Sequence, residues 1–183
     1  MLKKILIGLG VLVLLFVLFS VYALFIATPA SPPATTEYSN QGLEITINYS
    51  QPYKKGRLIF GDEADDALQP YGQYWRLGAN QATEITVNKD VLFGGQPLSA
   101  GSYRMYAVPG AQSFKVSLNS ELGVFFAVAK PDPDLDVLTV DAPVSIQANE
   151  TEMFTININD ADNGAQIDFV WDKVLFSVPI TVR

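Results

Sequence analysis

Apolar and polar residues alternate in the stretch Leu43-Glu44-Ile45-Thr46-Ile47-Asn48-Tyr49. Successive side chains of a β-strand point to opposite faces, so a period of two predicts a strand with one buried face and one face in water. The same period returns along most of the chain beyond residue 40, without a competing helical period. The other predicted strands are residues 57–60, 84–88, 102–108, 114–119, 124–129, 135–141, 144–148, 154–159, 166–171 and 174–182.

Turn residues separate these predicted strands. Asn163-Gly164 lies between two alternating runs and predicts a β-hairpin, because both residue types tolerate a positive φ. Gly94-Gly95 and Pro109-Gly110 end other runs. Short strands at this spacing predict an all-β, antiparallel fold of about ten strands over residues 41–183, and such regular alternation favours a β-sandwich.

The N-terminal region has a different character. An uncharged apolar run extends from Ile5 to Ala27, long enough to cross about 30 Å of hydrocarbon as a helix. A cleaved signal peptide is the alternative, but its apolar region would span only about 7 to 15 residues, and Ala27-Thr28-Pro29-Ala30 is a poor cleavage site. We therefore predict one transmembrane helix over residues 5–27, preceded by a cytoplasmic stub over residues 1–4.

The orientation follows from the basic residues beside this run. Lys3 and Lys4 precede it, and the next basic residue is Lys54, so the positive-inside rule places the N-terminus in the cytoplasm. Residues 28–40 contain several Pro, Ser and Thr residues and predict an extended stalk. The sequence thus predicts a single-pass protein of the bacterial inner membrane whose domain, residues 41–183, lies in the periplasm.

Composition excludes several classes of function. The 183 residues include no His and no Cys, which excludes thiol nucleophiles, disulfides and imidazole-based triads and argues against zinc sites. All 19 acidic residues follow the apolar run, whereas two of the 12 basic residues precede it. This acidic balance argues against a nucleic-acid partner, because phosphate binding needs clustered Lys and Arg. No cofactor is predicted.

Short blocks in the first half of the domain are more distinctive than the composition. They are Tyr49-Ser50-Gln51-Pro52, Lys55-Gly56-Arg57, Ile59-Phe60-Gly61, Pro70-Tyr71-Gly72, Trp75-Arg76, Gly78-Ala79-Asn80 and Leu98-Ser99-Ala100-Gly101-Ser102-Tyr103. In this order they resemble the bacterial family catalogued as domain of unknown function 2911, over about residues 43–182. Members of that family often carry Arg and Glu where this chain has Gln51 and Gln81. The resemblance implies an exported β-rich domain and assigns no activity.

These blocks also supply a candidate ligand site. Aromatic faces stack on sugars, and Arg and Asn side chains orient polar ligands, as in many binding clefts. The alternative is structural: Tyr and Trp are good core residues of β-proteins, and Arg76 pairs with a carboxylate. The candidate ligand-binding residues are Tyr49, Lys55, Arg57, Tyr71, Trp75, Arg76 and Asn80.

Acidic segments raise the questions of metal binding and catalysis. Asp132-Pro133-Asp134-Leu135-Asp136 has the alternating acids of a calcium loop but lacks its Gly at the sixth position and its Glu at the twelfth. Solvated turns explain this segment, and likewise residues 62–66 and 160–164, so no metal site is predicted. An enzyme without His or Cys would need paired carboxylates, as in glycosidases, and no sequence feature pairs two of them.

We therefore expect a non-enzymatic interaction module, or an accessory subunit of an envelope complex. A membrane anchor concentrates partners in one plane, and an exposed edge strand would offer a docking surface. Two alternatives stay open. One is a module that binds a glycan or a small polar ligand, and the other is a carboxylate-based hydrolase.

Overall fold

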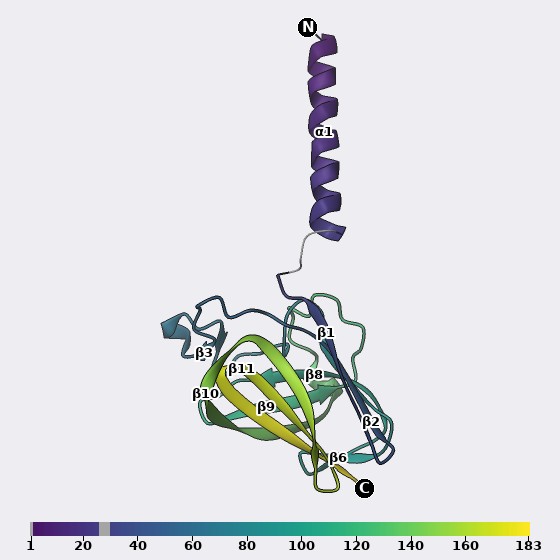
Figure 1. The fold of residues 1–183 in the computed structure, drawn as a ribbon, viewed down its shortest axis with the longest axis vertical. Coiled ribbons are helices and arrows are strands. Elements are labelled where there is room, and N and C mark those ends of the chain that lie inside the picture. Colours follow the sequence, from purple (N-terminus) through teal and green to yellow (C-terminus); the bar gives the residue numbers. More distant parts are fainter. Residues whose placement is uncertain (1, 26–29) are drawn as a thin grey trace. The chain divides into compact units, whose positions relative to one another are not determined.

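The computed structural model describes residues 2–25 and 30–183, in two compact units, Met1–Ala30 and Ser31–Arg183. The first unit is the single helix α1 (Leu2–Phe25), shown in Figure 1. Within the described part of the chain, no helix has the length and apolar character needed to cross a membrane. Residues 26–27 of the predicted span and residues 28–29 of the predicted stalk lie outside the described residues.

The second unit is mostly β. Its main sheet has nine antiparallel strands in the order β1-β2-β5-β8-β9-β10-β11-β6-β7. Two short strands, β3 and β4, form a separate parallel pair, and two 3₁₀ turns cover Glu63–Asp65 and Pro133–Leu135. The strands are β1 (Pro33–Asn40), β2 (Leu43–Ser50), β3 (Phe60–Gly61), β4 (Gln69–Pro70), β5 (Thr83–Val87), β6 (Val91–Phe93), β7 (Gln96–Leu98), β8 (Gly101–Val108), β9 (Ser113–Asn119), β10 (Asp136–Ala161) and β11 (Gly164–Val182).

The sheet folds back on itself at β10. The first part of this 26-residue strand, to Pro143, pairs with β9, and the part from Val144 pairs with β11. Two register shifts, between Ile146 and Thr155, interrupt the second pairing, and such irregularities bend a strand. The two halves of the sheet therefore face each other in a sandwich-like arrangement, with β10 and β11 in front of β9 in Figure 1.

The core lies between these two halves. Trp75 stacks on Trp171 with ring centroids 5.8 Å apart, and Phe114 of β9 stacks on Phe176 of β11 at 4.4 Å. The alternating apolar residues of β2 are also fully buried, as the period of two predicts. Aromatic pairs of this kind contribute about 0.5–1.5 kcal/mol each beyond their buried area, so they hold the two halves together.

Several sequence predictions are confirmed. The hairpin at Asn163-Gly164 joins β10 to β11, where Ala161 pairs with Gly164. Gly94-Gly95 joins β6 to β7, and both glycines have the positive φ that a tight hairpin turn requires. The chain is mostly β and antiparallel, with predicted strands merged into the longer β10 and β11.

Three predictions are wrong. Residues 57–59 of the strand predicted at 57–60 are not in a strand, and β3 begins only at Phe60. Residues 33–40, assigned to a stalk, form β1, because their half-buried alternate side chains pair register by register with β2. The folded unit accordingly begins at Ser31, not at residue 41. Residues 124–129, assigned to a strand, have no partner strand and form an irregular loop. An apolar run alone does not make a strand when no neighbour supplies the hydrogen bonds.

Candidate functional site

The predicted ligand residues Trp75 and Tyr49 belong to the core. The Trp75 side chain is 2% exposed, contacts the rings of Phe60, Phe154 and Trp171, and donates from Nε1 to the carbonyl oxygen of Gly78. Tyr49 is also buried, and its hydroxyl oxygen accepts the backbone N–H of residue 156 at 3.1 Å. Trp75 therefore offers no face on which a ligand could stack.

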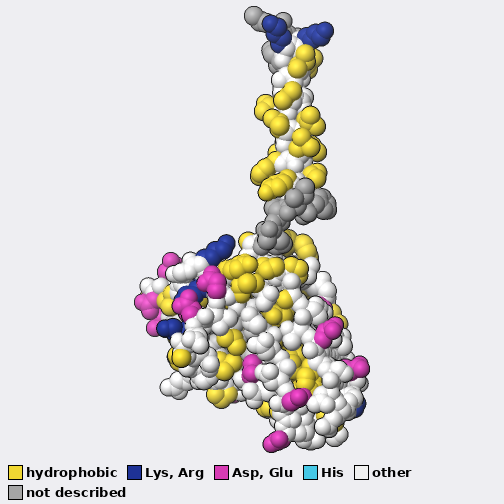
Figure 2. All heavy atoms as spheres, in the orientation of Figure 1, with side chains coloured by type: hydrophobic (Ala, Val, Ile, Leu, Met, Phe, Trp, Pro, Cys, Tyr) yellow, Lys and Arg dark blue, Asp and Glu magenta, His cyan; other side chains and the backbone are white. Residues whose placement is uncertain are grey.

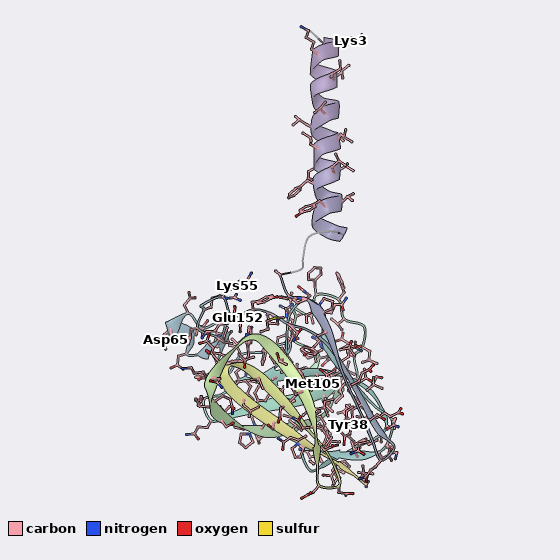
Figure 3. The ribbon with its side chains drawn as sticks, in the orientation of Figure 1. Lys3, Tyr38, Lys55, Asp65, Met105 and Glu152 are labelled. Atoms are coloured by element: carbon pink, nitrogen blue, oxygen red, sulfur yellow. The ribbon has the colours of Figure 1, made fainter. Side chains whose placement is uncertain are left out.

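Lys55 and Arg57 lie in an exposed turn before β3. The Arg57 guanidinium donates to the backbone oxygens of Lys54 and Tyr53, and the Lys55 Nζ lies 5.8 Å from the Tyr53 ring centroid. The backbone N–H of Lys55 donates to Glu152, which Figure 3 labels beside it. These contacts stabilise the turn.

The remaining predicted residues occupy the next loop. Tyr71 packs against the core, and the Arg76 guanidinium donates to the backbone oxygen of Asn80 at 3.3 Å. The Asn80 amide donates to the backbone oxygen of Ser31, which fixes the start of the folded unit. The structure thus does not bring the seven predicted residues together as one surface.

A different set of polar residues does come together. The strand register places Thr35, Asn48, Glu84, Arg104 and Asn119 opposite one another across β1, β2, β5, β8 and β9. Their neighbours Met105 and Ile47 point into the core, so this row lies on the outer face of the sheet. The loop of residues 121–130 covers the part of the row around Arg104.

Arg104 is the most unusual member of this row. It is 2% exposed although it lies on the outer face. Its Nη1 pairs with Glu121, and its Nη2 donates to the Tyr74 hydroxyl oxygen at 2.8 Å and to the backbone oxygen of Ala129 at 3.1 Å. Its Nε has no hydrogen-bond partner among the described residues. Burying a guanidinium is costly unless it is paired, so these contacts lock the loop onto the sheet.

A second buried network adjoins Arg104. The Tyr106 hydroxyl donates to Asp136 Oδ2 at 2.6 Å, and the Asn119 amide donates to Asp136 Oδ1 at 2.8 Å. Burial, followed by the Asp136 hydrogen bond, raises the pKa of Tyr106 to about 12. Asn119 also donates to the backbone of Asp132 and accepts the backbone N–H of Glu121. This network holds both ends of the loop.

An open groove runs between the loop and the start of β1. Its volume is about 350 Å³, and a smaller hollow of about 230 Å³ lies under the loop beside Arg104. Glu84 forms one wall and accepts the backbone N–H of Gly123 at 2.7 Å, while Thr35 donates to Asn48 at 2.8 Å. The groove is lined by Pro33, Ala34, Thr35, Asn48, Tyr49, Gln81, Ala82, Glu84, Gly123, Val124 and Phe125.

The two outer edges of the sheet are obstructed. Along β1, the Thr36 hydroxyl donates to the backbone oxygen of Ile156, and the Tyr38 hydroxyl donates to that of Gly164. The other edge, β7, has three residues, including Pro97, and Gln96 donates across it to β10. The expected docking at an exposed edge strand therefore has no support in this geometry.

The acidic segments form short turns or accept hydrogen bonds from neighbouring residues. Asp132 begins a 3₁₀ turn and accepts the backbone N–H of Asp134, and residues 63–65 form the other such turn. Asp160 accepts hydrogen bonds from Asn40 and Tyr38; the Asn40 bond, and then the Tyr38 bond, lower the pKa of Asp160. Across the described ranges 2–25 and 30–183, no group of three acidic side chains is arranged to hold a metal ion.

Sequence reasoning missed Arg104, Tyr106 and Asn119. The available signal was their spacing: Arg104 and Tyr106 stand two apart in a predicted strand and must share a face. Only the covering loop, which comes from residues 121–130, makes it buried.

The geometry defines an all-β domain with a polar outer face, an arginine-locked loop and an open groove. Residues 31–180 match the family described as "Protein of unknown function (DUF2911)", and the chain belongs to that family. No curated protein and no solved structure matches it. Gln51 donates to the backbone oxygen of Phe154, and Gln81 lines the groove.

Proposed function

We propose that this chain is a single-pass membrane protein that displays its β-domain in the bacterial periplasm as a non-enzymatic interaction module. The observation that carries this proposal is the character of α1. Exposed apolar side chains occur on every turn from Leu6 to Tyr22 (Figure 2). A helix that is apolar all round needs an apolar environment.

The sequence extends this argument beyond the described side chains. The uncharged run continues to Ala27, which is long enough for a membrane-spanning helix, and Lys3 and Lys4 precede it. The basic pair favours a cytoplasmic N-terminus and a domain on the other side of the membrane. An anchored binding domain is best suited to act as an accessory subunit of an envelope complex.

Cysteine labelling tests the topology, because the chain has no cysteine of its own. Gln112→Cys, in an exposed turn, should react with a membrane-impermeant maleimide in spheroplasts, whereas Leu2→Cys should react only after lysis. Both variants should remain in the membrane pellet after alkaline carbonate extraction. Release of the chain by carbonate, or labelling of Leu2→Cys in intact spheroplasts, would contradict the proposal.

Cross-linking in native membranes tests the interaction role. We expect a partner protein to co-purify at a fixed stoichiometry with the full-length chain in mild detergent. Asn48→Arg, which places a bulky cation in the groove, should reduce this partner if the groove is the contact. A chain that purifies alone after efficient cross-linking would contradict the interaction module.

The groove itself supports a second candidate, binding of a small polar ligand such as a glycan. A volume of about 350 Å³ is in the range of small-molecule sites, and Asn48 and Gln81 offer amide groups beside the Phe125 ring. Titration of the full-length chain with an N-acetylglucosamine tetrasaccharide in a calorimeter tests this. Heat that persists unchanged in the double variant Asn48→Ala, Gln81→Ala would exclude binding in the groove.

A hydrolase is less well supported. The described residues that line the groove include one carboxylate, Glu84, which already accepts a backbone N–H. Glycoside hydrolysis by carboxylates requires two of them about 5 to 10 Å apart. The geometry therefore favours binding over catalysis.

A further inference from the structure

The loop that covers Arg104 carries an exposed apolar segment, residues 122–129. It reads Leu122-Gly123-Val124-Phe125-Phe126-Ala127-Val128-Ala129, without a charge, and Lys130 follows it. The Phe125 side chain is 68% exposed, that of Phe126 57% and that of Val128 68%. Adjacent exposed aromatic residues of this size are uncommon on a protein that faces only water.

Three backbone carbonyl oxygens of the segment accept hydrogen bonds from the domain. Val124 accepts the N–H of Ala82 at 3.1 Å, and Ala127 accepts the Tyr74 hydroxyl at 3.1 Å. Ala129 accepts the Arg104 guanidinium at 3.1 Å. These three carbonyl oxygens are therefore bonded to the domain, while the side chains of Phe125, Phe126 and Val128 are exposed. This arrangement suits contact with an apolar phase.

Phe126 adds a second indication. Its φ is 56°, in the left-handed region that a bulky aromatic residue rarely occupies. Phe125 and Phe126 form an edge-to-face pair with ring centroids 4.5 Å apart. The backbone thus adopts an unfavourable conformation that keeps both rings at the surface.

The place of the segment in the chain indicates what it meets. Phe125 lines the same groove as Pro33 and Ala34, so the segment lies beside the start of β1 (Figure 1). Six peptide units separate Phe25, the last residue of α1, from Ser31, the first residue of the folded unit. A chain of that length reaches at most about 20 Å. If α1 spans the bilayer, the start of β1 is held close to the lipid surface.

We propose that residues 122–129 insert into the interfacial region of the bilayer that holds α1, as a second membrane contact of the domain. This inference rests on the proposed membrane anchor. Phenylalanine rings partition into that region without a basic patch, which agrees with the acidic balance of the domain. Because α1 confines the loop to the membrane surface, its effective concentration at the lipid is high. A contact that would be weak for a free domain is therefore formed most of the time. It would hold the groove in a defined orientation above the lipid.

The test uses the full-length chain in vesicles of phosphatidylethanolamine and phosphatidylglycerol. Phe126→Cys and Gln112→Cys are each labelled with an environment-sensitive fluorophore. Gln112 is the control position, because it is exposed in the turn before β9, whereas the apolar segment comes after β9 in the chain. We expect a blue-shifted emission at position 126 and its quenching by lipids that carry a spin label near the headgroup. The emission at position 112 should stay as in water.

A matched pair of variants tests whether the rings cause this effect. With the fluorophore on Leu122→Cys, the change Phe125→Ser together with Phe126→Ser should abolish the blue shift and the quenching. Ile146→Ser, which removes a side chain that is 71% exposed elsewhere on the domain, should leave both unchanged. Retention of lipid quenching without the two rings would overturn the proposal.

Other outcomes separate this inference from the anchor. If the chain fails to float with the vesicles, the proposed anchor is wrong, and the inference falls with it. If the chain floats but position 126 emits as in water, the anchor stands and the lipid contact is wrong. A blue shift without quenching by spin-labelled lipid would mean that protein, such as a second copy, covers the loop, and that too overturns the proposal.

Discussion

The buried Tyr106–Asp136 pair predicts a specific loss of stability at high pH. The Tyr106 hydroxyl donates to Asp136 at 2.6 Å in a buried site, and burial with that hydrogen bond raises the pKa of Tyr106 from 10.0 to about 12. Since the pKa is higher in the folded state, the stabilisation is fully present below pH 10 and is lost as the pH rises through 12. This rise in the pKa of Tyr106 corresponds to about 2–3 kcal/mol of unfolding free energy.

Tyr106→Phe isolates this effect. At neutral pH the variant should be less stable by about 1.5–3 kcal/mol, because it lacks a hydrogen bond to a charged acceptor. The difference between the two proteins should then shrink by about 2–3 kcal/mol between pH 9 and pH 12, because only the wild-type domain can ionise at this position.

Urea unfolding of residues 31–183 at several pH values gives the required free energies. Fluorescence is a suitable signal, because Trp75 and Trp171 are both buried and in contact. As a control, Asp136→Asn removes one of the groups that raise the pKa of Tyr106 and should weaken the pH dependence. A difference between wild type and Tyr106→Phe that is constant from pH 7 to pH 12 would refute the reasoning.

Three further predictions concern the fold. Trp75→Ala should lower the free energy of unfolding by about 3–5 kcal/mol, and a near-neutral result in urea titrations would mean that Trp75 is not a core residue. Gly164→Ala should be far more destabilising in thermal melts than Gly72→Ala, because its Cβ would lie 2.0 Å from a carbonyl oxygen of β11, whereas nothing lies within 4 Å at Gly72. The hydrogen bond from Asn40, and then that from Tyr38, lower the pKa of Asp160, so this contribution to stability is present above pH 3.8 and lost at lower pH. Asp160→Asn should therefore show a smaller drop in melting temperature than wild type between pH 6 and pH 3.

The candidate site was only partly predictable from the sequence. Trp75 and Arg76 are adjacent in a distinctive block, yet one is a core residue and the other donates to a loop backbone. The residue types of a block do not show whether its side chains serve packing or binding, because Tyr, Trp and Arg are suited to both. The groove depends on residues from β1, β2, the start of β5 and the loop 121–130, and no local pattern joins segments so far apart.

The failure over residues 124–129 has a specific cause. The run is apolar, as a buried strand is, but β9, the strand that precedes it in the chain, already pairs with β8 and β10. The same residues therefore form a loop whose phenylalanines are exposed. Conversely, the polar composition of residues 33–40 predicted a stalk, but these residues pair with the edge of β2 and form β1.

The sequence by itself determined the strand positions with a clear period of two, the hairpin at Asn163-Gly164, the apolar helix and the family. It also determined that imidazole and thiol chemistry are absent. These features depend on residue type or on the geometry of neighbouring residues. Tertiary structure alone decided the fold-back at β10, the burial of Arg104 and the groove, because burial depends on which distant segment packs against a residue.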